Sequence, residues 1–501
     1  MSGAEALVLT LAVPLAGAVG IVLLHRRPNP REAVSLISAG GLFAAVASML
    51  PEVLAGARPE VTLVSLLPGL PIRLAVEPLG LMFGLVSSGL WIVTSVYSIG
   101  YMRAGHAHKQ TRYYTCFAVA LASTMGVAFA GNMLTLFIFY EALTLSTYPL
   151  VAHHETREAV RAGRTYLGIL LGTSIGLQLV AIVWTWQLAG TLDFTAGGIL
   201  EGKVDGAFVP VLLALYMFGI GKAALMPVHR WLPAAMVAPT PVSALLHAVA
   251  VVKAGVFTVV KVIVYIFGAG FLAGLTGVDW LIYAAGATIL IASVIALRSD
   301  NLKRRLAYST VSQLSYVVMA AAIATPLSII GAALHIAAHA FGKITLFFAA
   351  GAISTVSHKT EVSELAGIGR RMPWTMGAFA VGAISMIGVP PTVGFVSKWY
   401  ILSGALKDGE TFAVAVIVLS TLLNAAYLLP IVYDAFFNEP VEAAANPGDD
   451  AGHQHGEAPL TIVAALVVSA AGTVILFFLP DLPPLSLAEQ LVGTTSRAGA
   501  P

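Results

Sequence analysis

The sequence predicts an all-α polytopic membrane protein. The chain of 501 residues is 58% hydrophobic and only 10% charged, whereas soluble proteins average about 45–50% and about 25%. Apolar stretches recur along the whole chain, and a membrane-spanning helix needs about 20 apolar residues. A single cysteine, Cys116, excludes a disulfide framework and a thiolate-held metal cluster. The scarcity of basic residues excludes nucleic acid as a partner.

About fourteen helical segments are expected, and short polar breaks bound each of them. The first lacks a clear cleavage site and is followed by His25, Arg26 and Arg27, so we expect a retained helix and not a signal peptide. In order, the segments cover residues 4–24, 33–55, 78–102, 113–130, 132–152, 165–189, 207–227, 241–267, 274–297, 306–324, 327–353, 374–403, 411–433 and 459–480.

Lysine and arginine are distributed unequally between the two sets of loops. Loops after odd-numbered segments hold 17 of these residues, and the opposite side holds five. Because positive loops stay in the cytoplasm, both termini are expected on the extracytoplasmic side of the cell membrane. The loop near residues 434–458 has no lysine or arginine and contains Asp449 and Asp450, so we expect an acidic cytoplasmic loop there.

Five lysines fall inside the apolar segments, and a glutamate lies about midway along one of them. Each costs at least about 2.5–3.5 kcal/mol at the centre of a membrane helix, so a role is expected for them. Lysine can release its proton when buried, whereas arginine cannot, which suits a proton relay. For Lys261, close to a segment end, snorkelling of the side chain to the headgroups is an equal alternative. The six residues are Glu141, Lys222, Lys253, Lys261, Lys343 and Lys398.

Two of these lysines lie beside residues that interrupt helices. Gly221 and Pro227 flank Lys222 in the seventh segment, and Pro390, Pro391 and Gly394 precede Lys398 in the twelfth. Broken helices in corresponding positions of two halves are typical of transporters built from repeats. We therefore predict Lys222 and Lys398 as counterparts. Glu141, in the fifth segment, is expected to pair with a lysine, first of all Lys222, although a purely structural ion pair is the alternative.

Histidines accompany the remaining lysines. His335, His339 and Lys343 are spaced to share one face of the eleventh segment, and His247 precedes Lys253 in the eighth. Histidine titrates near neutral pH, which favours a hydrogen-bonded proton wire over a metal site, since no carboxylate or cysteine is near. For His247 a packing role is equally compatible. No phosphate loop, nucleotide fingerprint or haem motif is present, so we expect no cofactor and no metal.

Five sequence runs carry a resemblance to a known family. They are Phe139-Tyr140-Glu141, the run from Lys222 to Pro233, Ala238 to His247, Asp300 to Leu314, and His335-x3-His339-Ala-x2-Lys343. Together they resemble the proton-conducting membrane subunits shared by respiratory complex I and the Mrp-type cation/proton antiporters. The resemblance implies two inverted five-helix repeats, segments 4–8 and 9–13, each with a broken helix. It assigns the proton pathway to Glu141, Lys222, Lys253, Lys398, His247, His335, His339 and Lys343.

The resemblance also implies a domain organisation and partners. Residues 1–112 would form N-terminal helices, 113–267 and 268–437 the two repeats, and 438–501 the acidic loop and last helix. One complex I subunit carries glutamate where this chain has Lys398, which favours the Mrp branch. The implied function is proton translocation in a sodium/proton antiporter with partner chains of the A, B, C, E, F and G types, not enzyme catalysis. The alternative is a proton-pumping subunit of a redox-driven complex, an NADH-quinone oxidoreductase or a membrane-bound hydrogenase.

Overall fold

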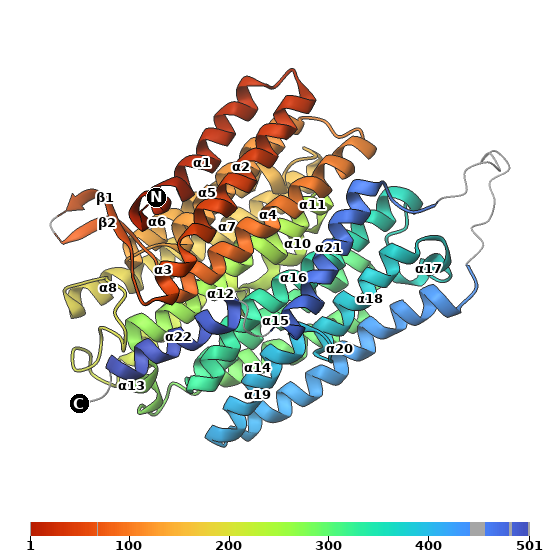
Figure 1. Ribbon diagram of the computed structural model, residues 1–501. Helices are drawn as coiled ribbons and strands as arrows, with labels where there is room; N and C mark the ends of the chain where they lie inside the picture. The colour runs from red at the N-terminus through yellow and green to blue at the C-terminus, as the bar shows by residue number, and fades with distance from the viewer. Residues whose placement is uncertain (1, 68, 441–455, 480–482, 499–501) are drawn as a thin grey trace.

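A computed structural model describes residues 2–67, 69–440, 456–479 and 483–498. Helices packed side by side make up a bundle, and one small β-hairpin lies at the end where α1 begins (Figure 1). The longer helices are α1 (Gly3–Leu23), α2 (Pro28–Ser48), α4 (Pro78–Ala104), α5 (Gln110–Ala128), α6 (Met133–Val151), α7 (Arg157–Thr173), α8 (Leu179–Ala189), α9 (Val209–Gly219), α12 (Val251–Lys261), α14 (Trp280–Arg298), α15 (Leu302–Ile323), α16 (Pro326–Ser357), α18 (Pro373–Ile387), α19 (Val393–Asp408), α20 (Thr411–Phe437), α21 (Leu460–Phe478) and α22 (Pro483–Ala498).

Short elements connect these helices. The strands β1 (Glu60–Leu67) and β2 (Leu70–Ala75) pair antiparallel. The short α-helices are α3 (Leu50–Leu54), α10 (Trp231–Ala234), α11 (Thr240–Ala244), α13 (Ala269–Ala273) and α17 (Ile368–Arg371). Three π-helical turns, η1 (Ser174–Gln178), η5 (Leu245–Val249) and η6 (Val262–Phe267), interrupt longer helical runs.

The membrane-protein class is confirmed. Ten helices among the described residues are long and apolar enough to cross a membrane. Several expected segments are divided between consecutive shorter helices, so the number fourteen and the inversion of the repeats stay predictions. Two elements were not expected: the hairpin β1–β2, and α22, which packs against α4 and α16. Of the acidic loop, residues 441–455 lie outside the described part.

Burial identifies the centre of the bundle. In the apolar stretch of α16, 94% of residues are buried, and in α15 89% are, against 28% along α7 to α8. A helix that is apolar all round and buried belongs to the core of the protein. The histidines of α16 are therefore at the core of the molecule and remote from its lipid-facing surface.

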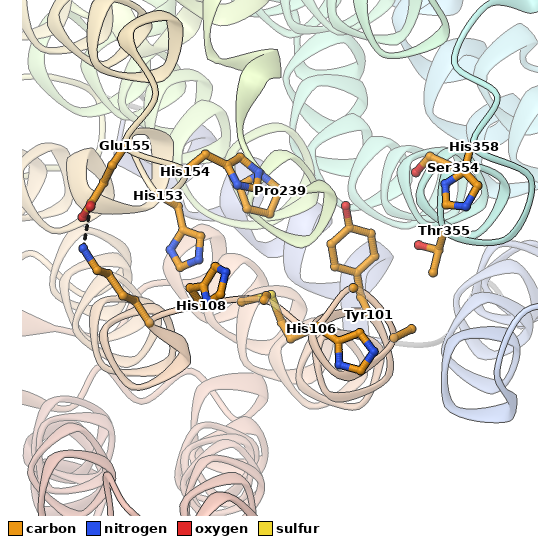
Figure 2. Close-up of a pocket in the computed structure, with 15 residues that line it drawn as sticks. Tyr101, His106, His108, His153, His154, Glu155, Pro239, Ser354, Thr355 and His358 are labelled. Atoms are coloured by element: carbon orange, nitrogen blue, oxygen red, sulfur yellow. Dashed lines mark hydrogen bonds and ion pairs between the residues drawn. The ribbon is translucent and has the colours of Figure 1, made fainter.

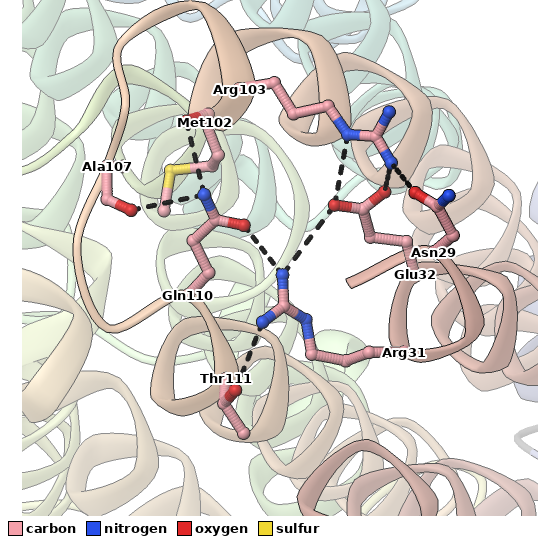
Figure 3. Close-up of polar contacts among 8 residues, drawn as sticks. All are labelled: Asn29, Arg31, Glu32, Met102, Arg103, Ala107, Gln110 and Thr111. Carbon is pink, nitrogen blue, oxygen red and sulfur yellow. Dashed lines mark hydrogen bonds and ion pairs between the residues drawn. The ribbon is translucent and has the colours of Figure 1, made fainter. Parts of the chain in front are cut away.

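Polar contacts fasten the N-terminal helices to the rest of the bundle at one end (Figure 3). Arg103, at the end of α4, forms an ion pair with Glu32 of α2 and donates a hydrogen bond to Asn29. Arg31 donates to Gln110 Oε1 at 2.7 Å and to Thr111 at the start of α5. Bidentate arginine contacts fix geometry as well as adding energy, so α2 is held in register with α4 and α5.

Candidate functional site

Lys222 lies where the α9 run is interrupted. Helix α9 ends at Gly219, and a single 3-10 turn (Gly221–Ala223) places Lys222 in the interior with no exposed surface. Its ammonium Nζ donates to the carbonyl oxygen of Tyr140 at 2.7 Å and to Thr144 Oγ1 at 2.6 Å, both on α6. The same Nζ lies 3.1 Å from the centre of the Tyr140 ring. Helix α6 thus holds the ammonium through oxygens and an aromatic face.

Glu141 follows Tyr140 on α6 but does not ion-pair with Lys222 in this structure. Both carboxylate oxygens are buried, and neither has a hydrogen-bond partner among the described residues. The reason is helical geometry: Tyr140 and Thr144 share one face, whereas Glu141 is rotated by about 100° from Tyr140. The structure therefore leaves a buried carboxylate beside, and not bonded to, the Lys222 ammonium.

Lys253 is joined directly to a histidine of another helix. It lies on α12, almost completely buried, and its Nζ contacts Nδ1 of His339 on α16. Gly255, two residues later, allows α12 to approach the broken helix, because an added Cβ would overlap the backbone of Lys222. The glycine explains how two lysine-bearing elements pack backbone against backbone.

His335 continues the connection one helical turn from His339. The two imidazole ring centres are 6.0 Å apart. His335 Nε2 hydrogen-bonds Gln313 Oε1 at 3.1 Å, and its Nδ1 hydrogen-bonds Ser397 Oγ of α19 at 2.9 Å. His335 thereby connects the core helix α16 with the residue immediately before Lys398.

Lys398 occupies the second interruption. Helix α18 ends at Ile387 and α19 begins at Val393, so the last carbonyl oxygens of α18 lack helical partners. Lys398 Nζ satisfies two of them by donating to the carbonyls of Met386 at 2.7 Å and Ile387 at 3.0 Å. A cation at a helix C-terminus is also favoured by the helix dipole. Pro390, Pro391 and Gly394 lie in or beside the break, as Gly221 and Pro227 do in the first one.

Lys343 lies one helical turn after His339 on α16 and makes its hydrogen bonds to α15. Its Nζ donates to Ser309 Oγ at 2.6 Å and to the carbonyl of Leu306 at 3.2 Å, both on α15. Ser309 Oγ in turn accepts a hydrogen bond from Tyr427 of α20. His247 is part of the π-helical turn η5, and its side chain lies outside what the structure describes.

Lys261 is not a snorkelling residue. Its side chain has no exposed surface, and Nζ lies 3.0 Å from Glu77 Oε2. It also donates to the carbonyl of Ala130 at 3.0 Å and lies 3.9 Å from the ring centre of Phe194. The alternative in which this lysine reaches the headgroups is therefore wrong, because an acidic partner in the N-cap position of α4 neutralises it inside the protein.

Sequence reasoning missed the neutral partners of these charges. Thr144, Gln313 and Ser397 are common residue types whose proximity to a lysine or histidine depends on the packing of separate helices. It also missed the π-helical turns η5 and η6 on both sides of α12. Such turns occur frequently at functional sites, but they have no simple sequence signal. In the described part of the chain, no group of three or more potential ligands is placed to hold a metal.

The fold and this site define a polytopic membrane protein in which buried lysine and histidine side chains (Lys253, His339 and His335) lie between two broken helices. Its sequence matches the family described as NADH:quinone oxidoreductase/Mrp antiporter, TM, over residues 130–424. NADH-quinone oxidoreductase subunit N of Desulforudis audaxviator is 33% identical over 484 residues, covering 94% of this chain and 95% of the relative. The chain belongs to this family and is a proton-conducting, antiporter-like membrane subunit.

A second curated relative and a solved structure are also similar to this chain. A Rhizobium meliloti protein described as a probable K(+)/H(+) antiporter component, of the A/B type, is 28% identical over 74% of this chain and 37% of its own length. Among solved structures, the Mrp complex of Dietzia sp. contains a chain with a TM-score of 0.88 at 23% identity, covering 100% of this chain and 98% of that one. The likeness to that structure shows a shared fold.

Proposed function

We propose that this protein is the proton-translocating subunit of a multisubunit antiporter that exchanges a monovalent cation, such as sodium, for protons. The observation that carries the proposal is the connection Lys253–His339–His335–Ser397, which ends at the residue before Lys398. A buried lysine is energetically unfavourable in a membrane, and a role in proton transfer along this series of donors and acceptors accounts for its presence.

The proton moves along this series by successive transfers. Lys253 Nζ gives a proton to His339 Nδ1 and becomes a neutral amine, while His339 becomes the cation. Transfer to His335 spans ring centres 6.0 Å apart and needs ring rotation or a bridging water. His335 then exchanges the proton with the Ser397 hydroxyl. Transfer from Ser397 to Lys398 needs a bridging water, because adjacent side chains of a helix point about 100° apart. The carbonyls at the end of α18 stabilise the Lys398 ammonium.

Glu141 and Lys222 act as the electrostatic control of this pathway. In this structure the ammonium is bound by Tyr140 and Thr144, and the carboxylate is unpaired among the described residues. Formation of the Glu141–Lys222 pair would move the positive charge of Lys222 from Tyr140 and Thr144 to the Glu141 carboxylate on the same helix, and would change its repulsion of Lys253. Two discrete positions of one charge give a gate that shifts the proton affinity of the next site.

The partners follow from the same assignment. An Mrp-type antiporter would supply chains of the A, B, C, E, F and G types, with this chain as the D type in a cell membrane and both termini outside. The second candidate is a proton-pumping subunit of a redox-driven complex. The similarity to an NADH-quinone oxidoreductase subunit N over nearly the full length of both chains favours it.

The experiment compares cation/proton exchange in everted vesicles from cells that express the whole neighbouring gene cluster. Lys253→Ala and Lys398→Ala are compared with wild type and with Lys407→Ala, an exposed lysine later on the same helix as Lys398. Exchange by wild type and Lys407→Ala, and its loss in both buried-lysine variants, supports the antiporter. Absence of exchange, with variant loss of NADH- or ferredoxin-driven proton pumping, assigns the chain to a redox-driven complex.

A further inference from the structure

Lys343 contacts a group of buried polar side chains that the proposed proton transfers do not use. The group consists of Ser309 on α15 and of Tyr427 and Asn424 on α20, and like Lys343 all three are 0% exposed. Lys343 Nζ donates to Ser309 Oγ at 2.6 Å, and the hydroxyl oxygens of Ser309 and Tyr427 are 2.8 Å apart. The Tyr427 hydroxyl also contacts Asn424 Oδ1. One series of hydrogen bonds therefore begins at an ammonium of α16 and ends at an amide of α20.

Asn424 ends this series. Its amide nitrogen Nδ2 is buried and has no hydrogen-bond partner among the described residues. A side-chain amide donates and accepts hydrogen bonds but does not itself take up a proton near neutral pH. The series is therefore no route by which a proton leaves Lys343, and its effect falls on Lys343 itself.

The Tyr427 hydroxyl lies between two oxygens but has only one hydrogen. It can donate to Ser309 Oγ or to Asn424 Oδ1, and not fully to both at once. A hydroxyl also accepts, so the contact between Ser309 and Tyr427 can be made with the hydrogen of either residue. The series therefore has two arrangements, which differ in the direction of its hydrogen bonds.

Each arrangement fits one protonation state of Lys343. An ammonium has no lone pair, so Lys343 donates to Ser309, Ser309 donates to Tyr427, and Tyr427 donates to Asn424. A neutral amine can accept from Ser309, which then accepts from Tyr427, and Asn424 loses its donor. The ammonium arrangement contains three hydrogen bonds and the amine arrangement two.

An arginine fixes the backbone beside Tyr427. Arg305 of α15 donates to the carbonyl oxygen of Tyr427 at 3.0 Å and to that of Ser299, at the end of α14, at 2.8 Å. These bonds hold α15 and α20 together at the level of Tyr427, and Arg305 adds a fixed positive charge there. A change of arrangement then needs only the rotation of two hydroxyl groups and no movement of a helix.

The titratable groups that face Lys343 from α12, α16 and α19 are basic. Lys253 of α12 and Lys398 of α19 interact with it electrostatically, and His339 lies one turn earlier on α16. The oxygens that hold its ammonium are neutral: the Ser309 hydroxyl and a main-chain carbonyl. A charge on Lys343 repels a proton on Lys253, so the state of Lys343 changes the proton affinity of the first donor in the proposed pathway.

A cavity reaches α16 at a different level. Its volume is about 530 Å³, and it is lined by five histidines together with Ser354 and Thr355 near the C-terminal end of α16 (Figure 2). Ser354 is 11 residues beyond Lys343, a rise of about 16 Å along a helix. Both hydroxyls donate to the carbonyl of Gly351 in their own helix. This histidine-lined cavity is therefore separate from the group around Lys343.

We propose that Ser309, Tyr427 and Asn424 are positioning residues that set the proton affinity of Lys343. Their three-bond arrangement favours the ammonium, and rotation of two hydroxyl groups accommodates the neutral amine. The inference rests on the proposed proton translocation and adds the residues that adjust its pH range. Because Lys343 acts on Lys253, a lower proton affinity of Lys343 moves the whole pH profile of transport toward lower pH.

The test is the pH profile of proton movement in everted vesicles, driven by an imposed cation gradient or by an electron donor. Tyr427→Phe removes the central hydroxyl, and Asn424→Leu removes the acceptor at the end of the series. Tyr433→Phe is the matched control, because it removes a hydroxyl from a tyrosine of the same helix that is 59% exposed. The amount of assembled complex in the membrane is measured for each variant.

Both variants should move the profile to lower pH by about 0.4–1 pH unit, which corresponds to one hydrogen bond. Tyr427→Phe removes two bonds from the ammonium arrangement and one from the amine arrangement, and Asn424→Leu removes one and none. The double variant loses the same bonds as Tyr427→Phe alone, so its profile should coincide with that of Tyr427→Phe. The Tyr433→Phe profile should coincide with wild type.

Unshifted profiles of Tyr427→Phe and Asn424→Leu, at whatever rate, overturn the inference and leave the proposed function standing. Shifts to higher pH, or shifts that add in the double variant, also overturn it. If Tyr427→Phe does not assemble, the direction of the Asn424→Leu shift decides. Absence of proton movement by wild type under both driving forces overturns the proposed function and this inference together.

Discussion

Glu77→Gln should destabilise the protein because it leaves the Lys261 ammonium buried without its counter-charge. Lys261 Nζ and Glu77 Oε2 are 3.0 Å apart, with side-chain exposures of 0% and 13%. At that distance and an effective dielectric constant of about 20, their attraction is about 5.5 kcal/mol. The carbonyl of Ala130 and the ring of Phe194 still face the ammonium in the variant. We therefore expect a smaller net loss, about 2–4 kcal/mol.

A double-mutant cycle measures the interaction free energy between Glu77 and Lys261. Lys261→Met keeps most of the aliphatic volume without the charge, and Glu77→Gln/Lys261→Met removes both charges together. We expect each single variant to lower the midpoint temperature of unfolding in detergent, and the double variant to recover most of the loss. Midpoints are compared at one heating rate, because unfolding of large proteins is frequently irreversible. Additive losses, or a Glu77→Gln midpoint equal to wild type, would refute the reasoning.

Three further predictions concern other parts of the molecule. Thr144→Val removes an oxygen that binds the Lys222 ammonium at 2.6 Å, so the proton transport rate in vesicles should fall about tenfold. Thr144→Ser keeps the hydroxyl and should transport protons at nearly the wild-type rate in the same assay. Gly394→Ala makes a Cβ overlap the carbonyl oxygen of Ser385 in α18, so the level of assembled protein should fall, whereas Gly377→Ala, with open space around it, should be tolerated. Ion pairs with Lys109 and Arg112 lower the pKa of Glu155 from 4.5 to about 2, so Glu155 stabilises the fold fully above pH 4.5 and loses that contribution as the pH falls to 2. The difference in the midpoint temperature of unfolding between wild type and Glu155→Gln should shrink over this range, and a constant difference would contradict the assignment.

The two helix breaks could be anticipated from local sequence, because their causes are local. Proline and glycine act on the backbone wherever they occur, and they do so beside Lys222 and Lys398. The hairpin β1–β2 was missed because its two short strands, with polar residues between apolar ones, do not form an apolar run of helical length. Helix α22 was missed for a similar reason: it is short and mixed in character, and its place against α4 and α16 depends on tertiary packing.

Pairing of charges could not be derived from the sequence. The expected partner of Lys222 was Glu141, but the neighbouring carbonyl of Tyr140 and the hydroxyl of Thr144 hold the ammonium. One residue along a helix changes the direction of a side chain by about 100°, which no composition argument resolves. Lys261 and Glu77 are far apart in the chain, and only the packing of α12 against the start of α4 brings them together.

The membrane class, the identity of the costly buried charges and the places where two helices break could all be predicted from the amino acids. These properties follow from hydrophobicity and backbone chemistry, which act residue by residue. Which atoms face each charge emerges only in the folded bundle: the contact of Lys253 with His339, the carbonyls around Lys398, and the histidine-lined cavity. A contact between helices depends on their relative position and rotation, and those are set by the packing of the whole bundle.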